Sequence, residues 1–224
     1  MGFAGSRLGF WYLDPDPPVE PIFVNCDFEL GFTDWVVEDR RIYLNGGSTV
    51  AGWPTPTDPT PAPGGVTDGK SFRVGPSFSH QLTTVTPSGS GQAAQLSCGG
   101  TFSSTPGSIL YGPVLYSAKP AQCRPGDVFS FQWYATGDPS SSVADAYNVF
   151  GYMLNSNTGA TITILDANGT APGSTSGWQT ESHTFTAGDQ GDYYFVFVCG
   201  SFDATFGLIV GSSLIIDNAC LTKA

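Results

Sequence analysis

Acidic residues stand near both ends of this chain, each next to apolar residues. Asn25-Cys26-Asp27-Phe28-Glu29 alternates polar and apolar positions, and an aromatic residue follows at Trp35. Towards the other end, Leu214-Ile215-Ile216-Asp217-Asn218 is an apolar run that stops on an acid and an amide. Carboxylates are the ligands of hard divalent cations. The pattern predicts extended segments at both ends that meet in one closed β-sandwich whose last strand holds a cation or a loop.

Paired carboxylates can also perform glycoside hydrolysis, in which two acids flank the scissile bond. The pairs Asp27/Glu29 and Glu38/Asp39 have the residue types but no pattern that fixes their separation in space. The chain has no Gly-x-Ser-x-Gly elbow, no phosphate-binding glycine loop, and only two histidines, neither beside a nucleophile. We therefore expect no enzymatic activity.

Aromatic side chains could bind sugars, because the C–H faces of a sugar stack on rings while its hydroxyls need nearby polar groups. Trp133 and Tyr134 are neighbours on one expected strand, so they point to opposite faces and at least one lies in the core. For every such ring, core filling is the competing interpretation. The candidates for glycan binding are Trp53, Tyr134 and Tyr147, with Trp133, Tyr152 and Gln132 also considered.

The composition and charge of the chain disfavour several classes of partner. The 224 residues carry a net charge of −11, which disfavours nucleic acid and anionic membrane surfaces and leaves divalent cations and neutral ligands. No window is long and apolar enough to insert into a membrane, and we expect no secretory signal at the N-terminus. The 5 cysteines lack Cys-x-x-Cys spacing, so we expect free, buried thiols, with a Cys98–Cys123 bridge as the alternative and no zinc site.

Strand patterns and turn clusters alternate along the chain, with 29 glycines and 17 prolines and no amphipathic helix. This predicts an all-β fold, a two-sheet antiparallel jelly-roll β-sandwich over residues 22–224, with a Pro/Thr-rich surface loop at 51–69. Residues 1–21 form either a first strand or an extended arm that docks on a neighbouring subunit. Phe3, Phe10, Trp11 and Tyr12 would be its anchor. The expected strands are 93–98, 108–116, 127–135, 146–154, 160–166, 179–185, 192–198 and 213–221.

Several of these segments resemble, in order, the strands of jelly-roll carbohydrate-binding modules that bind xylan and β-glucan. The segments are 25–29 with Trp35, 112–116, 124–135, 177–186, 191–195 and 214–218. The resemblance implies a structural calcium ion held by Glu29 and Asp217, with Asp27 as a helper. Asp217 as a turn cap and Glu29 as a solvated strand residue are the competing interpretations.

A second resemblance concerns 147–152 and 197–207, which are similar to jelly-roll segments in structural proteins of marine bacteriophages, cyanophages among them, and in bacterial adhesins. It implies a virion structural protein, made in the host cytoplasm without a signal peptide: a capsid decoration, neck, tail or fibre component. Its partners would be other virion proteins, copies of itself and host-surface glycans. The alternative is a carbohydrate-binding module or adhesin domain that recognises cell-surface or plant-type polysaccharide.

Overall fold

The computed structural model describes residues 25–38, 42–44, 77–103, 109–137, 146–169, 171, 173–202 and 208–224. The expected N-terminal arm with Phe3, Phe10, Trp11 and Tyr12, and the 51–69 loop with Trp53, lie outside these residues. Every regular element within them is a β-strand. The described part has no helix with the length and hydrophobicity needed to span a membrane.

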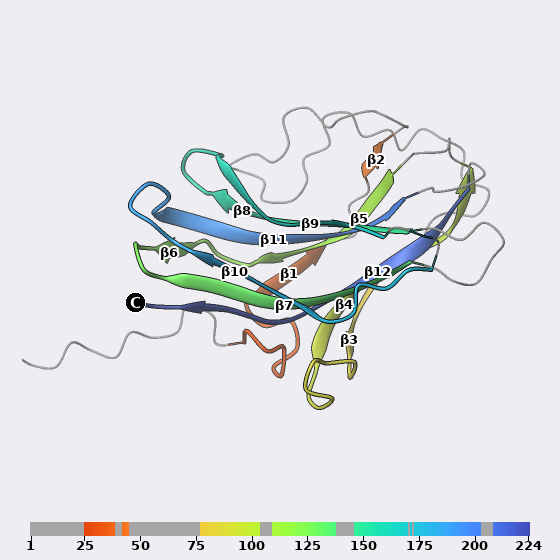
Figure 1. Ribbon diagram of the computed structural model, residues 1–224, viewed down its shortest axis with the longest axis horizontal. Coiled ribbons are helices and arrows are strands. Elements are labelled where there is room, and N and C mark those ends of the chain that lie inside the picture. Colours follow the sequence, from red (N-terminus) through yellow and green to blue (C-terminus); the bar gives the residue numbers. More distant parts are fainter. Residues whose placement is uncertain are drawn as a thin grey trace, which may run out of the picture.

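Two antiparallel sheets lie face to face (Figure 1). The seven-stranded sheet has the order β1-β5-β11-β8-β9, with β2 beside β5 and β6 beside β11. Its strands are β1 (Trp35–Glu38), β2 (Ile42–Leu44), β5 (Ile109–Ser117), β6 (Ala121–Cys123), β8 (Ala146–Asn155), β9 (Thr161–Asn168) and β11 (Gly191–Phe202).

The five-stranded sheet has the order β10-β7-β12-β4-β3. Its strands are β3 (Ser77–Thr83), β4 (Ala93–Ser103), β7 (Val128–Gly137), β10 (Gln179–Thr184) and β12 (Leu208–Thr222). The predicted all-β, two-sheet jelly-roll sandwich is thus confirmed.

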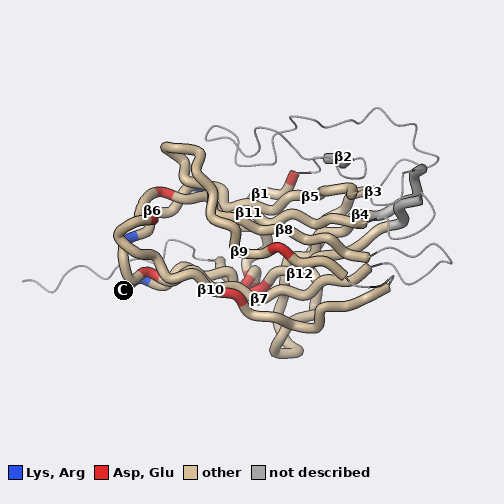
Figure 2. Tube along the Cα trace, turned by 45° about the horizontal axis from the view of Figure 1, so that its top comes forward, with Lys and Arg blue, Asp and Glu red and all other residues tan. Residues whose placement is uncertain are grey.

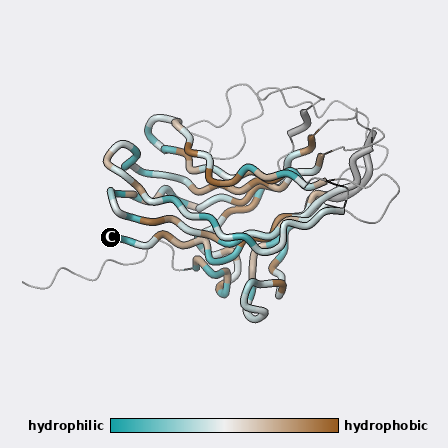
Figure 3. Tube along the Cα trace, viewed as in Figure 1, coloured by the Kyte–Doolittle hydropathy of each residue, from teal (hydrophilic) through white to brown (hydrophobic). Residues whose placement is uncertain are grey.

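The core lies between the sheets and is rich in aromatic rings. In β7, Phe129, Phe131 and Trp133 are buried while the residues between them are partly exposed, which is the period of two expected of a sheet with one solvated face. Phe129 stacks on Phe195 of the opposite sheet with a centroid distance of 3.8 Å. Apolar stretches, coloured brown, lie within strands of both sheets, and several of the turns that connect strands are hydrophilic (Figure 3).

The eight strands expected from 93 onwards are all present, most with ends that differ by a few residues. One expectation is wrong: residues 25–34 form successive turns and not a strand. Phe28 and Asp34 adopt positive φ angles of 58° and 68°, which reverse the chain direction. The buried Asn25 side chain stabilises these turns by donating to Gly31 O and accepting from the Leu30 N–H.

Candidate functional site

The outer face of the five-stranded sheet combines aromatic and amide side chains. Tyr134 is partly exposed on this face, and Trp133, the next residue back along β7, is only 5% exposed in the core. The prediction that at least one of the two rings is a core residue is confirmed. Trp178 immediately precedes β10 and lies 5.7 Å from the Tyr134 ring, with the ring planes 42° apart. The two rings form a partly exposed aromatic pair.

Amide side chains continue from this pair across the sheet. Strand register places Tyr134 opposite Ile215, Ile215 opposite Gln95, and Gln95 opposite Gln81. Gln81 Nε2 donates to Gln95 Oε1 at 3.0 Å. With a strand spacing of about 4.8 Å, the row from Trp178, next to β10, to Gln81 of β3 is roughly 19 Å long, and the buried Ile215 lies in its middle. We call it the aromatic–amide row.

A second pair of amides lies beside the row. Asn218 Nδ2 donates to Gln132 Oε1 at 2.6 Å. Asn218 adopts a positive φ of 51°, and the pairing of β12 with β7 shifts register between Asp217 and Cys220. This β-bulge turns the Asn218 side chain towards Gln132, where both amides keep further donors and acceptors.

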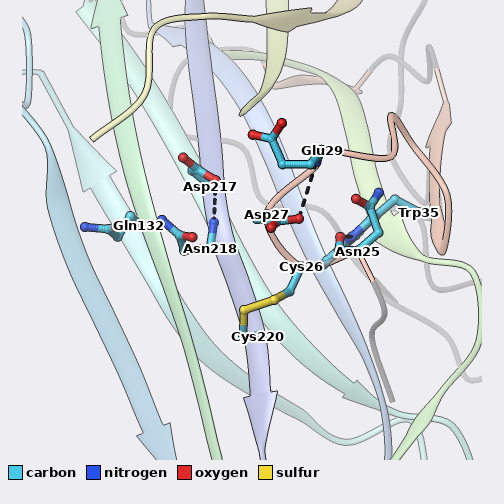
Figure 4. Close-up of a disulfide and its surroundings, with 9 residues drawn as sticks. All are labelled: Asn25, Cys26, Asp27, Glu29, Trp35, Gln132, Asp217, Asn218 and Cys220. Carbon is cyan, nitrogen blue, oxygen red and sulfur yellow. Dashed lines mark hydrogen bonds between the residues drawn. A yellow bond between two sulfur atoms is a disulfide. The ribbon is translucent and has the colours of Figure 1, made fainter. Parts of the chain in front are cut away.

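The three predicted carboxylates come from two segments that adjoin on this face (Figure 4). Asp217 is in β12 and only 5% exposed, whereas Asp27 and Glu29 are in the 25–34 loop. Burial, together with the charges of Asp27 and Glu29, raises the pKa of Asp217 to about 6 against the lowering effect of the hydrogen bond from the Asn218 N–H. Asp27 and Glu29 therefore lie near enough to Asp217 for their charges to act on its carboxyl group.

Each of these carboxylates already accepts a backbone hydrogen bond. Asp217 Oδ1 accepts from the Asn218 N–H at 2.7 Å, Asp27 Oδ1 from the Glu29 N–H at 3.3 Å, and Glu29 Oε1 from the Gln92 N–H at 2.6 Å. Gly91 permits the last contact, since a Cβ at this position would clash with Glu29 Oε1. Within the described ranges, no three acidic, histidine or cysteine residues converge closely enough to hold one metal ion. The calcium ion that the sequence resemblance implies therefore stays a prediction, and other oxygen atoms would have to complete its ligand set.

A disulfide joins the same two segments. Cys26 is bonded to Cys220, 194 residues later, and the Ala219 N–H donates to Cys26 O at 2.8 Å. The expectation of five free thiols is therefore wrong for this pair. Cys98, Cys123 and Cys199 are buried thiols outside any disulfide, as expected, so the alternative Cys98–Cys123 bridge does not form. Spacing along the chain carries no signal for a pair of cysteines this far apart.

Two other predicted aromatic residues face away from this surface. Tyr147 is 7% exposed and belongs to the main core, so its ring is not available to a glycan and the prediction for this residue is wrong. Tyr152 is 1% exposed in a smaller apolar cluster formed by β5, β8 and β11. Trp178, Gln81 and Gln95 were not predicted as site residues. The alternation along 93–97 could have placed Gln95 outward, but only the fold brings Trp178 to Tyr134.

Comparisons with known proteins give a remote likeness. No family model matches the chain, and no curated protein matches it. A family 61 carbohydrate-binding module solved with β-1,4-galactotriose is 12% identical, with 91% of this chain and 99% of that chain covered and a TM-score of 0.44. The family 11 module of Clostridium thermocellum, solved with a β-1,3-1,4-mixed-linked tetrasaccharide, is 14% identical over 82% and 96%, with a TM-score of 0.33.

A third similar structure is a cyclase and not a carbohydrate-binding module. The Stig cyclase Fisc of Fischerella sp. TAU, solved with an indole derivative, is 13% identical over 90% of this chain and 96% of that chain, with a TM-score of 0.41. Because the likenesses are this remote, the fold assignment depends on the sheet order described above, and any functional argument depends on the residues of the outer face.

Proposed function

We propose that this protein is a non-catalytic glycan-binding β-sandwich that holds a neutral oligosaccharide on the outer face of its five-stranded sheet. The observation that carries the proposal is the aromatic–amide row. Tyr134 and Trp178 offer a pair of rings for the C–H face of a sugar, and Gln95 and Gln81 offer donors and acceptors for hydroxyl groups along the same line.

The length and charge of this face favour a chain of neutral sugars. A row roughly 19 Å long extends beyond a single sugar ring. The net charge of −11 and the carboxylates beside the row repel polyanions, whereas neutral hydroxyl groups can donate to carboxylates and amides. These observations support the carbohydrate-binding alternative of the sequence analysis. No feature of the described residues favours the virion role, which stays a prediction together with its partners and location.

Isothermal titration calorimetry with a panel of oligosaccharides tests the proposal. The panel would contain β-1,4-galactotriose, the mixed-linked β-glucan tetrasaccharide and xylohexaose, the ligands named in similar solved structures. We expect saturable binding of at least one of them. Tyr134→Ala and Trp178→Ala should each weaken it by roughly tenfold or more, because each removes one ring of the aromatic pair.

The matched control is Tyr194→Ala, which removes a partly exposed tyrosine from the outer face of the other sheet. It should leave the affinity unchanged. Equal losses in all three folded variants, or binding that survives the loss of both Tyr134 and Trp178, would show that the glycan binds elsewhere. The absence of binding to any glycan on a broad array would contradict the proposed function itself.

A further inference from the structure

A polar pocket lies at the end of the sandwich, away from the aromatic–amide row. Its volume is about 300 Å³, at the lower end of the range for small-molecule sites. Strand β7 separates the two places, and the six residue steps from Val128 to Tyr134 alone span about 20 Å. The lining residues are Gln122, Cys123, Arg124, Pro125, Gln190, Gly191 and Asp192.

The side formed by β6 and the following turn is held in place by several bonds. Cys123 and Gln122 pair with Gly191 and Asp192 of β11. The Arg124 N–H donates to Asp127 Oδ2 at 2.9 Å, and the same carboxyl group accepts from Lys223 Nζ at 2.8 Å. The backbone that carries Arg124 is therefore anchored to the buried Asp127, which is 3% exposed.

The opposite side is the loop between β10 and β11, and its own carboxylate is already bonded. Asp189 Oδ1 accepts from the Thr186 hydroxyl at 2.7 Å, and Asp189 Oδ2 lies 2.8 Å from His183 Nε2. These contacts, with burial opposing them, lower the pKa of Asp189. Asp189 thus fixes the shape of the loop and is not the group that faces a ligand.

The charges at this end are unevenly paired. Figure 2 shows basic segments at the end near β6 and the C-terminus, beside acidic ones. Lys223 is neutralised by its ion pair with Asp127. Arg124 is exposed, and Nη2 donates to the neutral Gln122 Oε1 at 2.8 Å, with no carboxylate partner for its side chain in the part of the chain described. Its guanidinium keeps donors for a ligand carboxylate.

Asp192 and the glutamine side chains complete the lining. Among the described residues, the side-chain partner of Asp192 Oδ2 is Asn157 Nδ2 at a long 3.4 Å, so this oxygen can accept hydroxyl hydrogens. Burial raises the pKa of the Cys123 thiol to about 12, and the charge of Lys223 opposes this rise only in part. A thiol of this kind is not nucleophilic near neutral pH, so the pocket is suited to reversible binding.

We propose that this pocket binds a single uronic acid unit, with Arg124 holding the ligand carboxylate and Asp192, Gln122 and Gln190 holding its hydroxyl groups. A carboxylate matches the planar fork of the guanidinium, and a sugar ring supplies the hydroxyls that the carboxylate and amides require. This site does not depend on the aromatic–amide row, so the two can succeed or fail independently.

Nuclear magnetic resonance titration of the full chain tests this site. The probes are methyl glucuronoside and methyl galacturonoside, with methyl glucoside as the neutral match. We expect saturable shifts of the backbone amides of 122–124 and 190–192 with at least one uronoside and weaker binding of the glucoside. Arg124→Gln should reduce uronoside affinity by roughly tenfold or more, because charge-assisted hydrogen bonds are lost.

Lys119→Gln is the matched control, since Lys119 is an exposed cation in the turn before β6 and should leave affinity unchanged. Arg124→Lys keeps the charge but not the fork, so an intermediate loss is expected even if the glutamine variant unfolds. Tyr134→Ala should leave uronoside binding intact. The proposal is overturned if the glucoside binds as tightly as the uronosides, if no saturable shift occurs at 122–124 or 190–192, or if folded Arg124 variants bind like the unaltered chain.

Discussion

Cys26 and Cys220 form a disulfide across a sequence separation of 194 residues. The bond fastens the turns of 25–34 to the last strand just after the β-bulge at Asp217 and Asn218. The pairing of β4 with β12 ends at Ile216. Beyond that point, the Ala219 N–H of β12 donates to Cys26 O instead. Disulfides of this kind are typical of oxidising compartments, and this one holds Asp27 and Glu29 beside Asp217.

Removing the disulfide should destabilise the fold without unfolding the sheets at room temperature. For Cys26→Ser with Cys220→Ser we expect a loss of about 2–5 kcal/mol in the free energy of unfolding, because the unfolded chain is no longer cross-linked. Urea denaturation measures it. Dithiothreitol should produce the same loss in the unaltered chain and none in the double variant. Equal stability with and without reductant in the unaltered chain would show that the bond does not form in solution.

Replacing Asp217 by Asn should stabilise the protein at neutral pH. Burial and two neighbouring carboxylates raise the Asp217 pKa to about 6, so the ionised form is disfavoured in the folded state. The folded protein keeps a proton that the unfolded chain releases between about pH 4 and pH 6, so stability falls as pH rises through that window. Above it, the variant should gain up to about 3 kcal/mol.

The pH dependence distinguishes this charge effect from a packing effect. The stability difference between Asp217→Asn and the unaltered chain should vanish below about pH 4, where both carry a neutral side chain. Glu181→Gln, which changes an exposed acid on β10, serves as the control and should show little difference. A difference for Asp217→Asn that is constant from pH 4 to pH 8 would contradict the electrostatic explanation.

Calcium should raise the melting temperature if the prediction from the sequence resemblance holds. A divalent cation would offset the mutual repulsion of Asp217, Asp27 and Glu29, and water or backbone oxygens would have to supply the remaining ligands. Differential scanning fluorimetry with calcium and with a chelator measures the shift. Glu29→Gln should lose the response while Glu181→Gln keeps it. If neither calcium nor the chelator changes the melting temperature, these acids bind no calcium and the prediction is wrong.

Lys223→Met should destabilise the end of the sandwich near neutral pH. Burial acts to raise the Asp127 pKa, but hydrogen bonds from Lys223 and from the N–H groups of Arg124 and Ala224 outweigh it, so the pKa is lowered. The stability from ionised Asp127 is present above the ordinary aspartate pKa and is lost as pH falls through the lowered value.

We expect Lys223→Met to cost about 1–3 kcal/mol at pH 7 and progressively less in acid. Urea denaturation at several pH values checks this trend. The exposed Lys119→Met is the control and should cost much less. A cost that stays the same at pH 2 would mean that the methionine disturbs packing and that the ion pair contributes little.

The sequence by itself determined the fold class and the location of most strands. Alternation of buried and exposed positions in β7 decides which face Phe131 and Trp133 cover, because successive side chains on a strand point to opposite sides. The same rule allowed Tyr134 to be placed on the other face. The rule does not identify the core side of a strand in which apolar residues continue without alternation. Tyr147 of β8 has such neighbours, and for this reason the prediction that it is exposed was wrong.

Only the tertiary structure decided which distant residues meet. The aromatic–amide row joins Trp178, Tyr134 and Gln95 because β10, β7, β12 and β4 are neighbours in the sheet, and strand order is set by the packing of the whole sandwich. The Cys26–Cys220 bond and the pocket at Arg124 arise in the same way. The local pattern of apolar and polar residues indicates which side of a strand is apolar. Contacts between segments far apart in the chain depend on how all the strands pack together.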